Sequence, residues 1–397
     1  MLIVPLQEAK PGMKLAANVP HPADPENDLL KAGFVLEESV IGRLGDLGIN
    51  VLYIDYPDLR ELDQHLLPTL SPARVQLYRQ IKATIAAIQK TAKPTVGFAD
   101  YYVTVRELVL TLMQRGEHPV YVEFMAGGLG ADEVGHAAAV AHLSLILGIR
   151  LHRYLIKERN RLDPAHAADV VNLGVAGMMH DIGKAKLSRR LHLYSSINPP
   201  QDSAALEEWE SHPKVGYDMI RGGVESSAAA AVLQHHQHFD GTGFPSTLAR
   251  DGTAIVYEGS KIHVFARILH AADLYDRLAS EAQDEGRRSS AEVLHLMKTH
   301  YATRLDPQVL YALPHVVPPF PPGGKVTLSD GSAAVVIALN SDDPYRPFIR
   351  RFTSDGAGLE PGGISLAADG ALEVESVGGV VVRHLIPARA SKKAAPA

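Results

Sequence analysis

The sequence predicts a mainly α protein: a helical bundle occupies the middle of the chain, with a small α/β unit before it and a small β unit after it. Three observations lead to this prediction. Apolar residues in the middle of the chain recur at the period of about 3.6 residues that marks a helix. Short apolar runs, broken by proline and glycine, fill residues 1–64. After Leu313, five closely spaced prolines precede runs that alternate apolar and polar residues, as strands do.

The first 64 residues are expected to fold as a small N-terminal domain of the regulatory type. Leu2 to Leu6 and Val51 to Asp55 are apolar runs of strand length. Glu37 to Leu47 carries the periodicity of a helix. No phosphoacceptor or cofactor motif occurs in this region, so the sequence does not identify an input signal.

Helical periodicity dominates the middle of the chain. Ser71 to Thr91 and Tyr102 to Arg115 predict two helices, so residues 65–130 are interpreted as a helical connector. Residues 131–316 are expected to form the catalytic domain, which begins with a helix over 131–159.

A later helix of this domain has a recognisable start. Asp163 is followed by Pro164, which is the pattern of an N-cap residue with proline at the first helical position. This helix is expected to run through VNLGVAGMMHD, which ends with the adjacent residues His180 and Asp181.

Residues 317–388 are predicted to form a small β-rich domain. KVTLSDGSAAVVIALN alternates apolar and polar residues around an Asp-Gly turn. Further strand-like runs follow at Phe348 to Phe352, Ile364 to Leu366 and Val377 to Val382. The last segment, 389–397, is rich in alanine and lysine and is expected to be a disordered tail.

Composition and charge exclude several classes of protein. A net charge of −6 argues against nucleic acid or an anionic membrane as a general partner. The absence of cysteine excludes disulfides and thiolate metal sites. No apolar run approaches the roughly 18 to 20 residues of a membrane span, and the chain begins without a basic, apolar leader. A cytoplasmic location without membrane contact is therefore expected.

An ordered set of histidines and aspartates predicts a site for more than one metal ion. Imidazole and carboxylate groups without thiolates suit divalent transition metals. Adjacent residues leave a helix about 100° apart, so His180 can bind one ion while Asp181 bridges that ion and a neighbour roughly 3.5 to 4 Å away. Lys184 is expected on the same face, where a fixed cation suits an anionic substrate. The candidate ligands are Asp132, His136, His180, Asp181, His212, His235, His236 and Asp273.

Four stretches of the chain resemble the HD-GYP proteins, the bacterial cyclic di-GMP phosphodiesterase branch of the HD hydrolase superfamily. They are MMHDIGKAKL at 178–187, the pair His212-Pro213, HHQHFDGTGFP at 235–245 and RILHAADLYDRLAS at 267–280. The resemblance covers about 131–316 and implies an all-helical HD-type bundle. KPGM at 10–13 and the run 35–55 also resemble a small domain found before some HD-GYP domains.

The resemblance assigns the metal ligands to the residues named above, apart from Asp132. Some family members recruit a third metal with a glutamate four residues before the first histidine, and this chain has the shorter Asp132 there. Two ions and three are both compatible with the sequence, and Asp132 could equally cap a helix.

Substrate contacts depart from the family pattern. The tyrosine of the GYP signature is Phe244, within a GYP-like loop that includes Asp240, Gly241, Gly243 and Pro245. The family's two cations after the last aspartate are replaced by Ala282 and Glu285. Arg287 and Arg288 follow closely and are the candidate replacements.

The implied chemistry is hydrolysis of a phosphodiester. Two metals bridged by water generate hydroxide that attacks phosphorus in line. Lys184 would stabilise the developing charge or protonate the leaving oxygen. Cyclic di-GMP would open to pGpG, and a third metal would favour a second cut to GMP. The His and carboxylate ligands favour iron or manganese over zinc.

Other functions remain open at this point. The chain could hydrolyse another nucleotide, or it could be a noncatalytic module that binds cyclic di-GMP or a GGDEF-type diguanylate cyclase through the GYP-like loop. A homodimer is also compatible with the sequence. Single histidines are more often solvated or core residues than ligands. That interpretation is given to His142, His152, His166, His192, His238, His263, His270, His295 and His300.

Overall fold

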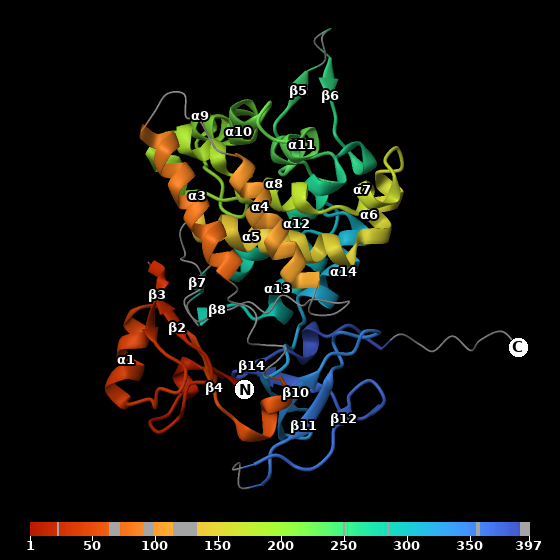
Figure 1. Cartoon of the computed structure of the whole chain (residues 1–397). Coiled ribbons are helices and arrows are strands. Elements are labelled where there is room, and N and C mark those ends of the chain that lie inside the picture. Colours follow the sequence, from red (N-terminus) through yellow and green to blue (C-terminus); the bar gives the residue numbers. More distant parts are fainter. Residues whose placement is uncertain are drawn as a thin grey trace, which may run out of the picture.

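A computed structural model describes most of the chain, and it confirms the mainly α prediction (Figure 1). The described residues are 1–21, 24–62, 72–90, 98–113, 133–248, 251, 253–280, 282–283, 286–354 and 358–389. A helical body forms the upper part of the view in Figure 1, and the N- and C-terminal units lie below it.

The N-terminal unit combines one helix with short strand pairs, close to the predicted ranges. β1 (Leu2–Pro5) pairs antiparallel with β4 (Val51–Ile54), and α1 (Glu38–Asp46) lies between them in the chain. β2 (Val19–His21) and β3 (Asp24–Leu30) form a second pair.

The C-terminal unit is a six-stranded sheet, in the order β12-β11-β10-β9-β13-β14. The described pairings are antiparallel, and Gly331, with φ 82°, supplies the predicted turn between β9 and β10. Residues 390–397 of the expected tail lie outside the described residues, whereas Arg389 donates to the carbonyls of Leu366 and Asp369. The strands are β9 (Lys325–Leu328), β10 (Ala333–Ala338), β11 (Phe348–Arg351), β12 (Ile364–Ser365), β13 (Val374–Val377) and β14 (Val380–Val381).

The two small units pack against each other, although the C-terminal sheet also has a core of its own. The Ile3 amide donates to the Gly323 carbonyl at 2.8 Å, and Val335 is buried among the apolar residues of the N-terminal unit. Lys325 pairs with Glu8 at 3.1 Å across 317 positions of sequence. Local patterns could not predict this contact, because it joins the two ends of the chain.

The helical body is organised around α5 (Glu133–Arg150), which is buried over most of its length. The helices next to it are α3 (Pro72–Lys90), α8 (Val171–Met179), α12 (Val264–Ser280) and α14 (Pro307–Val316). The others are α4 (Phe98–Met113), α6 (His152–Glu158), α7 (Pro164–Ala168), α9 (Ser203–Glu210), α10 (His212–Ile220), α11 (Ser226–Gln234) and α13 (Ser290–His300).

The prediction of a single helix over 131–159 is wrong beyond Arg150, where α5 ends. The chain bends by 82° between α5 and α6. Tertiary contacts account for the bend, since α6 brings Glu158 to Arg267 and the Tyr154 hydroxyl to Asp306 at 2.7 Å. These buried polar contacts outweigh the local preference for a continuous helix.

The cap at Asp163 is confirmed, but the helix that it opens is shorter than predicted. The Asp163 side chain accepts from the amides of Ala165 and His166, with Pro164 at the first helical position. α7 then ends at Ala168, because Arg159 Nη1 donates hydrogen bonds to the carbonyl oxygens of His166, Ala167 and Asp169. A separate helix, α8, leads to the site.

The bundle is not entirely helical. Two short hairpins leave it, β5 (Thr247–Leu248) with β6 (Ala254–Ile255) and β7 (Ala282–Gln283) with β8 (Gly286–Arg287). β5 and β6 lie between α11 and α12 in the chain, and β7 and β8 lie between α12 and α13. The β5–β6 hairpin projects from the top of the body in Figure 1.

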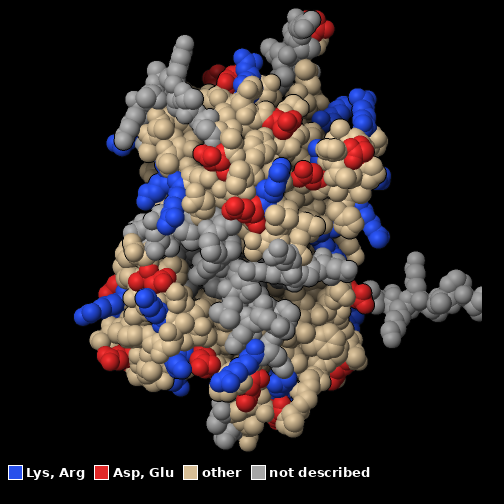
Figure 2. All heavy atoms as spheres, viewed as in Figure 1, with Lys and Arg blue, Asp and Glu red and all other residues tan. Residues whose placement is uncertain are grey.

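The surface charges and the lengths of the helices bear on the predicted partners. On the face shown in Figure 2, cationic and anionic side chains are interspersed rather than collected in one patch. Among the described residues, no single helix is both long and apolar enough to cross a membrane, although the bent pair α5 and α6 passes the same test together.

Candidate metal centre

The adjacent residues His180 and Asp181 lie where α8 ends. His180 follows the last residue of α8, and Asp181 precedes a short 3-10 helix, η4 (Ile182–Lys186). Gly183 allows η4 to lie directly on α10, because a Cβ there would be 2.0 Å from the His212 carbonyl oxygen. This close approach brings Asp181 to the His212 ring.

The other candidate ligands come from four helices. His136 lies in the first turn of α5, His212 opens α10, His235 follows α11, and Asp273 lies within α12. All of these side chains are buried. Residues far apart in the sequence therefore converge on one interior site.

Asp181 divides the site into two groups. Its Oδ1 lies 3.2 Å from His212 Nε2 and 3.8 Å from His235 Nε2. Its Oδ2 lies 3.4 Å from His180 Nε2 and 3.8 Å from His136 Nε2. The ligand atoms of Asp181, His212, His235 and His236 lie within 4.8 Å of one another, as do those of His136, His180 and Asp181. One carboxylate thus faces two clusters that could each hold an ion.

Backbone carbonyls orient three of the imidazoles. The Nδ1 atoms of His180, His212 and His235 lie 2.8, 2.7 and 2.7 Å from the carbonyl oxygens of residues 177, 209 and 232. These hydrogen bonds place the proton on Nδ1 and leave each Nε2 as an acceptor aimed at the cluster. Histidines that bind metals are held in this way.

His236 supplies a further sign that the donor set fits a cation. Its ring is 3% exposed, and neither ring nitrogen has a hydrogen-bond partner among the described residues. Buried polar atoms are rarely left without a partner, because the lost hydration costs free energy. A divalent ion would satisfy His236 together with Asp181 Oδ1, which is also without a hydrogen bond.

The titration of these groups differs between the two clusters. Burial lowers the pKa of His212 to about 4, and it also lowers the pKa of His235 and His236. These rings are neutral and able to bind metal at pH 7. Burial acts to lower the pKa of His136 too, but the carboxylates of Asp273 and Asp276 outweigh it and raise that pKa to about 9.

Known proteins with similar sequences share this region. The HD domain family matches residues 149–309. A cyclic di-GMP phosphodiesterase of Pseudomonas aeruginosa is 24% identical over 352 residues, which are 82% of this chain and 78% of that protein. Residues 149–309 therefore carry an HD domain, which agrees with the resemblance to the HD-GYP proteins seen in the sequence. The HD domain family is a family of hydrolases.

Two further similarities cover different shares of the chain. A 3'3'-cGAMP-specific phosphodiesterase of Vibrio cholerae is 26% identical over 149 residues, 37% of this chain and 29% of that protein. A solved HDG"Y"P protein of Bdellovibrio bacteriovorus aligns with a TM-score of 0.42 and 14% identity, over 79% of this chain and 97% of that chain.

The GYP-like loop covers one side of the centre. The Phe244 ring stacks on His236, with centroids 4.6 Å apart and planes 27° apart. Gly243 is needed because a Cβ there would lie 2.3 Å from the His236 carbonyl oxygen. Asp240 accepts from the amide and hydroxyl of Thr242, which shapes the turn. Gln237 donates to the Pro245 carbonyl at 2.8 Å.

Some of the residues discussed as candidates for the site lie outside the described part of the chain. Asp132 and Glu285 lie outside the described residues, as does the side chain of Arg287. Arg288 donates to the Leu278 carbonyl at 3.0 Å, at the end of α12.

Sequence reasoning missed three residues that contact the centre. Trp209, 1% exposed, lies with its ring centroid 5.2 Å from that of His212 and 5.7 Å from that of His236. Arg277 Nη2 lies 3.0 Å from Asp181 Oδ2, and Glu133 holds the same guanidinium at 3.2 Å. The available signals were the lone tryptophan three residues before His212 and an arginine four residues after Asp273.

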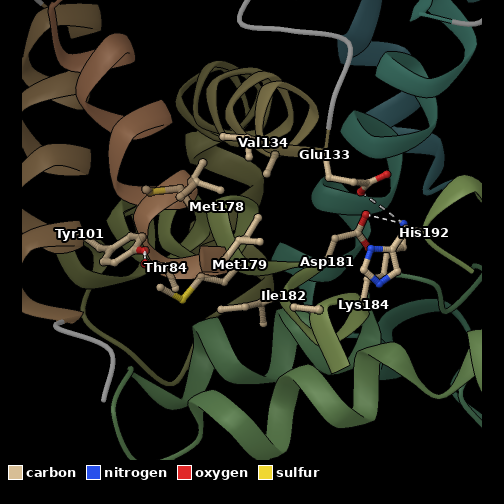
Figure 3. Close-up of a pocket in the computed structure, with 14 residues that line it drawn as sticks. Thr84, Tyr101, Glu133, Val134, Met178, Met179, Asp181, Ile182, Lys184 and His192 are labelled. Carbon is tan, nitrogen blue, oxygen red and sulfur yellow. Dashed lines mark hydrogen bonds and ion pairs between the residues drawn. The ribbon is translucent and has the colours of Figure 1, made fainter. Parts of the chain in front are cut away.

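A cavity of about 230 Å³ opens beside the centre (Figure 3). Its polar end contains Glu133, Asp181, Lys184 and His192, and its other end is mostly apolar. His192 had been interpreted as an ordinary surface or core histidine, yet its Nε2 is buried without a hydrogen-bond partner among the described residues. The apolar wall includes Ile81, Ile85, Val134, Ala137, Met178, Met179 and Ile182.

Proposed function

We propose that this chain is a metal-dependent phosphodiesterase that hydrolyses cyclic di-GMP to linear pGpG. The main support is the bridging position of Asp181, whose two oxygens face two separate groups of buried histidines. The Pseudomonas aeruginosa relative, which carries the name of this activity, matches 82% of the chain.

Each side chain has a role in this proposal. Divalent ions held by the two groups would polarise the phosphodiester and lower the pKa of an attacking water. His136 and His180 would hold one ion with Asp181 and Asp273, and His212, His235 and His236 would hold the other with Asp181. Lys184, with Nζ 2.6 Å from Asp181 Oδ2, is placed to stabilise the charge that develops on the phosphate or to protonate the leaving oxygen.

The ligand set supports iron or manganese over zinc, because it consists of imidazoles and carboxylates without a thiolate. Whether the protein also produces GMP depends, in this proposal, on a third ion near Asp132. The cavity beside Lys184 offers apolar surface for the part of the substrate that extends beyond the reacting phosphate.

Two alternatives have specific support. The Vibrio cholerae relative is named for 3'3'-cGAMP, so a mixed cyclic dinucleotide is the second candidate substrate. A noncatalytic binding module, which contacts a GGDEF-type cyclase through the GYP-like loop, is the third candidate. It is disfavoured because six described candidate ligands place their ligand atoms in two clusters, each within 4.8 Å: His136, His180, Asp181, His212, His235 and His236.

Hydrolysis assays with purified protein separate these possibilities. The protein would be loaded with Fe(II) or Mn(II) and given cyclic di-GMP or 3'3'-cGAMP, with products separated by chromatography. The proposal expects pGpG from cyclic di-GMP and no product from the His180→Ala, Asp181→Ala double variant. Hydrolysis of 3'3'-cGAMP alone would favour the second substrate, and tight binding without hydrolysis of either would favour the binding module.

A further inference from the structure

The bridging carboxylate has two cationic neighbours that belong to different elements. Lys184 Nζ from η4 lies 2.6 Å from Asp181 Oδ2, and Arg277 Nη2 from α12 lies 3.0 Å from the same oxygen. The two cations therefore meet at the atom through which Asp181 faces His136 and His180. Arg277 is one helical turn beyond Asp273, so one helix supplies both a candidate ligand and a cation.

Arg277 is anchored independently of Asp181. Glu133 accepts from Nη1 at 3.4 Å and from Nη2 at 3.2 Å, and Nε lies 3.6 Å from Asp273 Oδ1. A guanidinium has five N–H donors in a fixed plane, and this geometry suits carboxylate and phosphate equally well. Glu133 can hold the edge formed by Nη1 and Nη2 while Nη2 exchanges its other hydrogen bond, to Asp181, for one to another acceptor.

Ion binding alters the charge around Asp181 Oδ2. A carboxylate oxygen that binds a divalent ion has less negative charge to offer Lys184 and Arg277, and the ion itself repels both cations. Four carboxylates, those of Glu133, Asp181, Asp273 and Asp276, then face two side-chain cations and two divalent ions. The loaded centre has an excess of positive charge, which an anionic ligand would neutralise.

We propose that Arg277 is a substrate-binding residue, which together with Lys184 holds the nonbridging oxygens of the phosphodiester at the mouth of the centre. This inference rests on the proposed function for the identity of the substrate, but it needs only a phosphodiester for the contact itself. Arg277 is 16% exposed and Lys184 is 5% exposed in their side chains, so the arginine is the more accessible of the two cations. The Glu133 carboxylate keeps the guanidinium in position, and its removal would leave Arg277 free to turn away.

The test compares Arg277→Ala with Arg277→Lys and with Arg221→Ala as a matched control. Arg221 is exposed and pairs with Asp218 at 3.3 Å, so its removal changes the net charge equally without touching the centre. Metal content is measured by elemental analysis, and the thermal midpoint shows whether each variant folds. Binding of a slowly hydrolysed phosphorothioate analogue of cyclic di-GMP is measured by calorimetry, beside kcat and KM for cyclic di-GMP.

Arg277→Ala is expected to keep its metal and to weaken analogue binding by about 10- to 100-fold, the range of one charge-assisted hydrogen bond to phosphate. KM rises with kcat changed less, and Arg277→Lys recovers part of the loss because it keeps the charge without the planar group. Arg221→Ala binds like the wild type. Unchanged analogue affinity in metal-replete Arg277→Ala overturns the proposal, as does a loss of affinity fully explained by lost metal.

A small substrate separates this proposal from the proposed function. Bis(p-nitrophenyl) phosphate offers a phosphodiester without guanine bases, and its hydrolysis by the wild type is expected to have a KM that rises in Arg277→Ala. If the wild type cleaves this compound and ignores cyclic di-GMP, the proposed substrate is wrong while Arg277 is still tested. An unchanged KM for the small diester in Arg277→Ala refutes the phosphate contact.

Discussion

His136 Nδ1 lies 2.7 Å from Asp276 Oδ2, on the side of the ring that faces away from the metal cluster. The hydrogen bond fixes which edge of the imidazole points at Asp181 and Asp273. Asp276 is itself buried and follows Asp273 by three residues on α12. One helix therefore places both a candidate ligand and the group that orients another.

Replacement of Asp276 by asparagine tests this orienting role. Asp276→Asn keeps the size of the side chain and removes its charge, so the His136 ring loses its strongest acceptor. Affinity for the ion at His136 and His180 is expected to fall by about 10- to 100-fold, with the other ion retained. Competition with a metal chelator measures the two affinities. Equal weakening of both ions would show that Asp276 supports the fold rather than this ligand.

The fluorescence of the single tryptophan is expected to report metal binding by the group formed by His212, His235 and His236. Trp209 lies against His212 and His236, with ring centroids 5.2 and 5.7 Å away. A paramagnetic ion bound by these histidines would quench its fluorescence, since quenching by such ions acts over short distances. Titration of metal-free protein with Mn(II) is expected to lower the emission to a plateau. An emission that stays constant while metal content rises would place the ion elsewhere.

The pH dependence of metal binding should differ between the two groups. The pKa of His136 is raised to about 9, so this ring carries a proton at pH 7 that an ion must displace. Affinity at this group is expected to rise by up to ~100-fold between pH 7 and 9, about tenfold per unit. The pKa of His212 is lowered to about 4, so the other group should gain nothing over this range. Calorimetry in buffers with different ionisation enthalpies counts the released proton, and affinities that rise in parallel would contradict the assignment.

The same protonation has a consequence for the metal-free fold. The pKa of His136 lies above the ordinary value of 6.5, so its ion pairs stabilise the folded state fully below pH 6.5. That contribution is lost as the pH rises through 9. Ion binding replaces it, because a metal satisfies the ligands once the proton has left.

A substitution that fills the cavity beside Lys184 is expected to weaken substrate binding without affecting the metal ions. Ile85 on α3 lines the apolar end, so Ile85→Trp would fill part of the roughly 230 Å³ volume. We expect a higher KM for cyclic di-GMP, with metal content and hydrolysis of bis(p-nitrophenyl) phosphate unchanged. Leu110→Trp serves as the control, since Leu110 on α4 is 54% exposed. Wild-type kinetics in Ile85→Trp would mean that the substrate stays out of this cavity.

The sequence predicted most of the helices and strands, and it named the residues that the structure brings together around Asp181. Motif residues such as His180 and Asp181 were recognisable because the chemistry needs particular side chains in a particular order. The break between α5 and α6 was not predictable, because it depends on the ion pair between Glu158 and Arg267, which are more than 100 residues apart. Local periodicity contains no information on such a partner.

The sequence predicted the cationic side chains of the site less completely than its candidate metal ligands. Their position after the last candidate aspartate makes Arg287 and Arg288 the candidates in the sequence, whereas Arg277 reaches Asp181 from inside α12. Whether Arg277 points inward depends on how α12 is rotated about its axis, and that rotation is seen only from its contacts with Glu133 and Asp181 in three dimensions. The contact between the N- and C-terminal units was hidden for the same reason, since Glu8 and Lys325 are 317 positions apart.

The number of metal ions per chain tests the account most directly. Elemental analysis of wild-type protein, prepared anaerobically with Mn(II) or Fe(II) and freed of excess metal, would be compared with Asp181→Ala. The account predicts about two tightly bound ions in the wild type and the loss of both high affinities when the bridging carboxylate is removed. A wild-type protein that hydrolyses cyclic di-GMP without bound metal, or an Asp181→Ala variant with undiminished metal content, would contradict it.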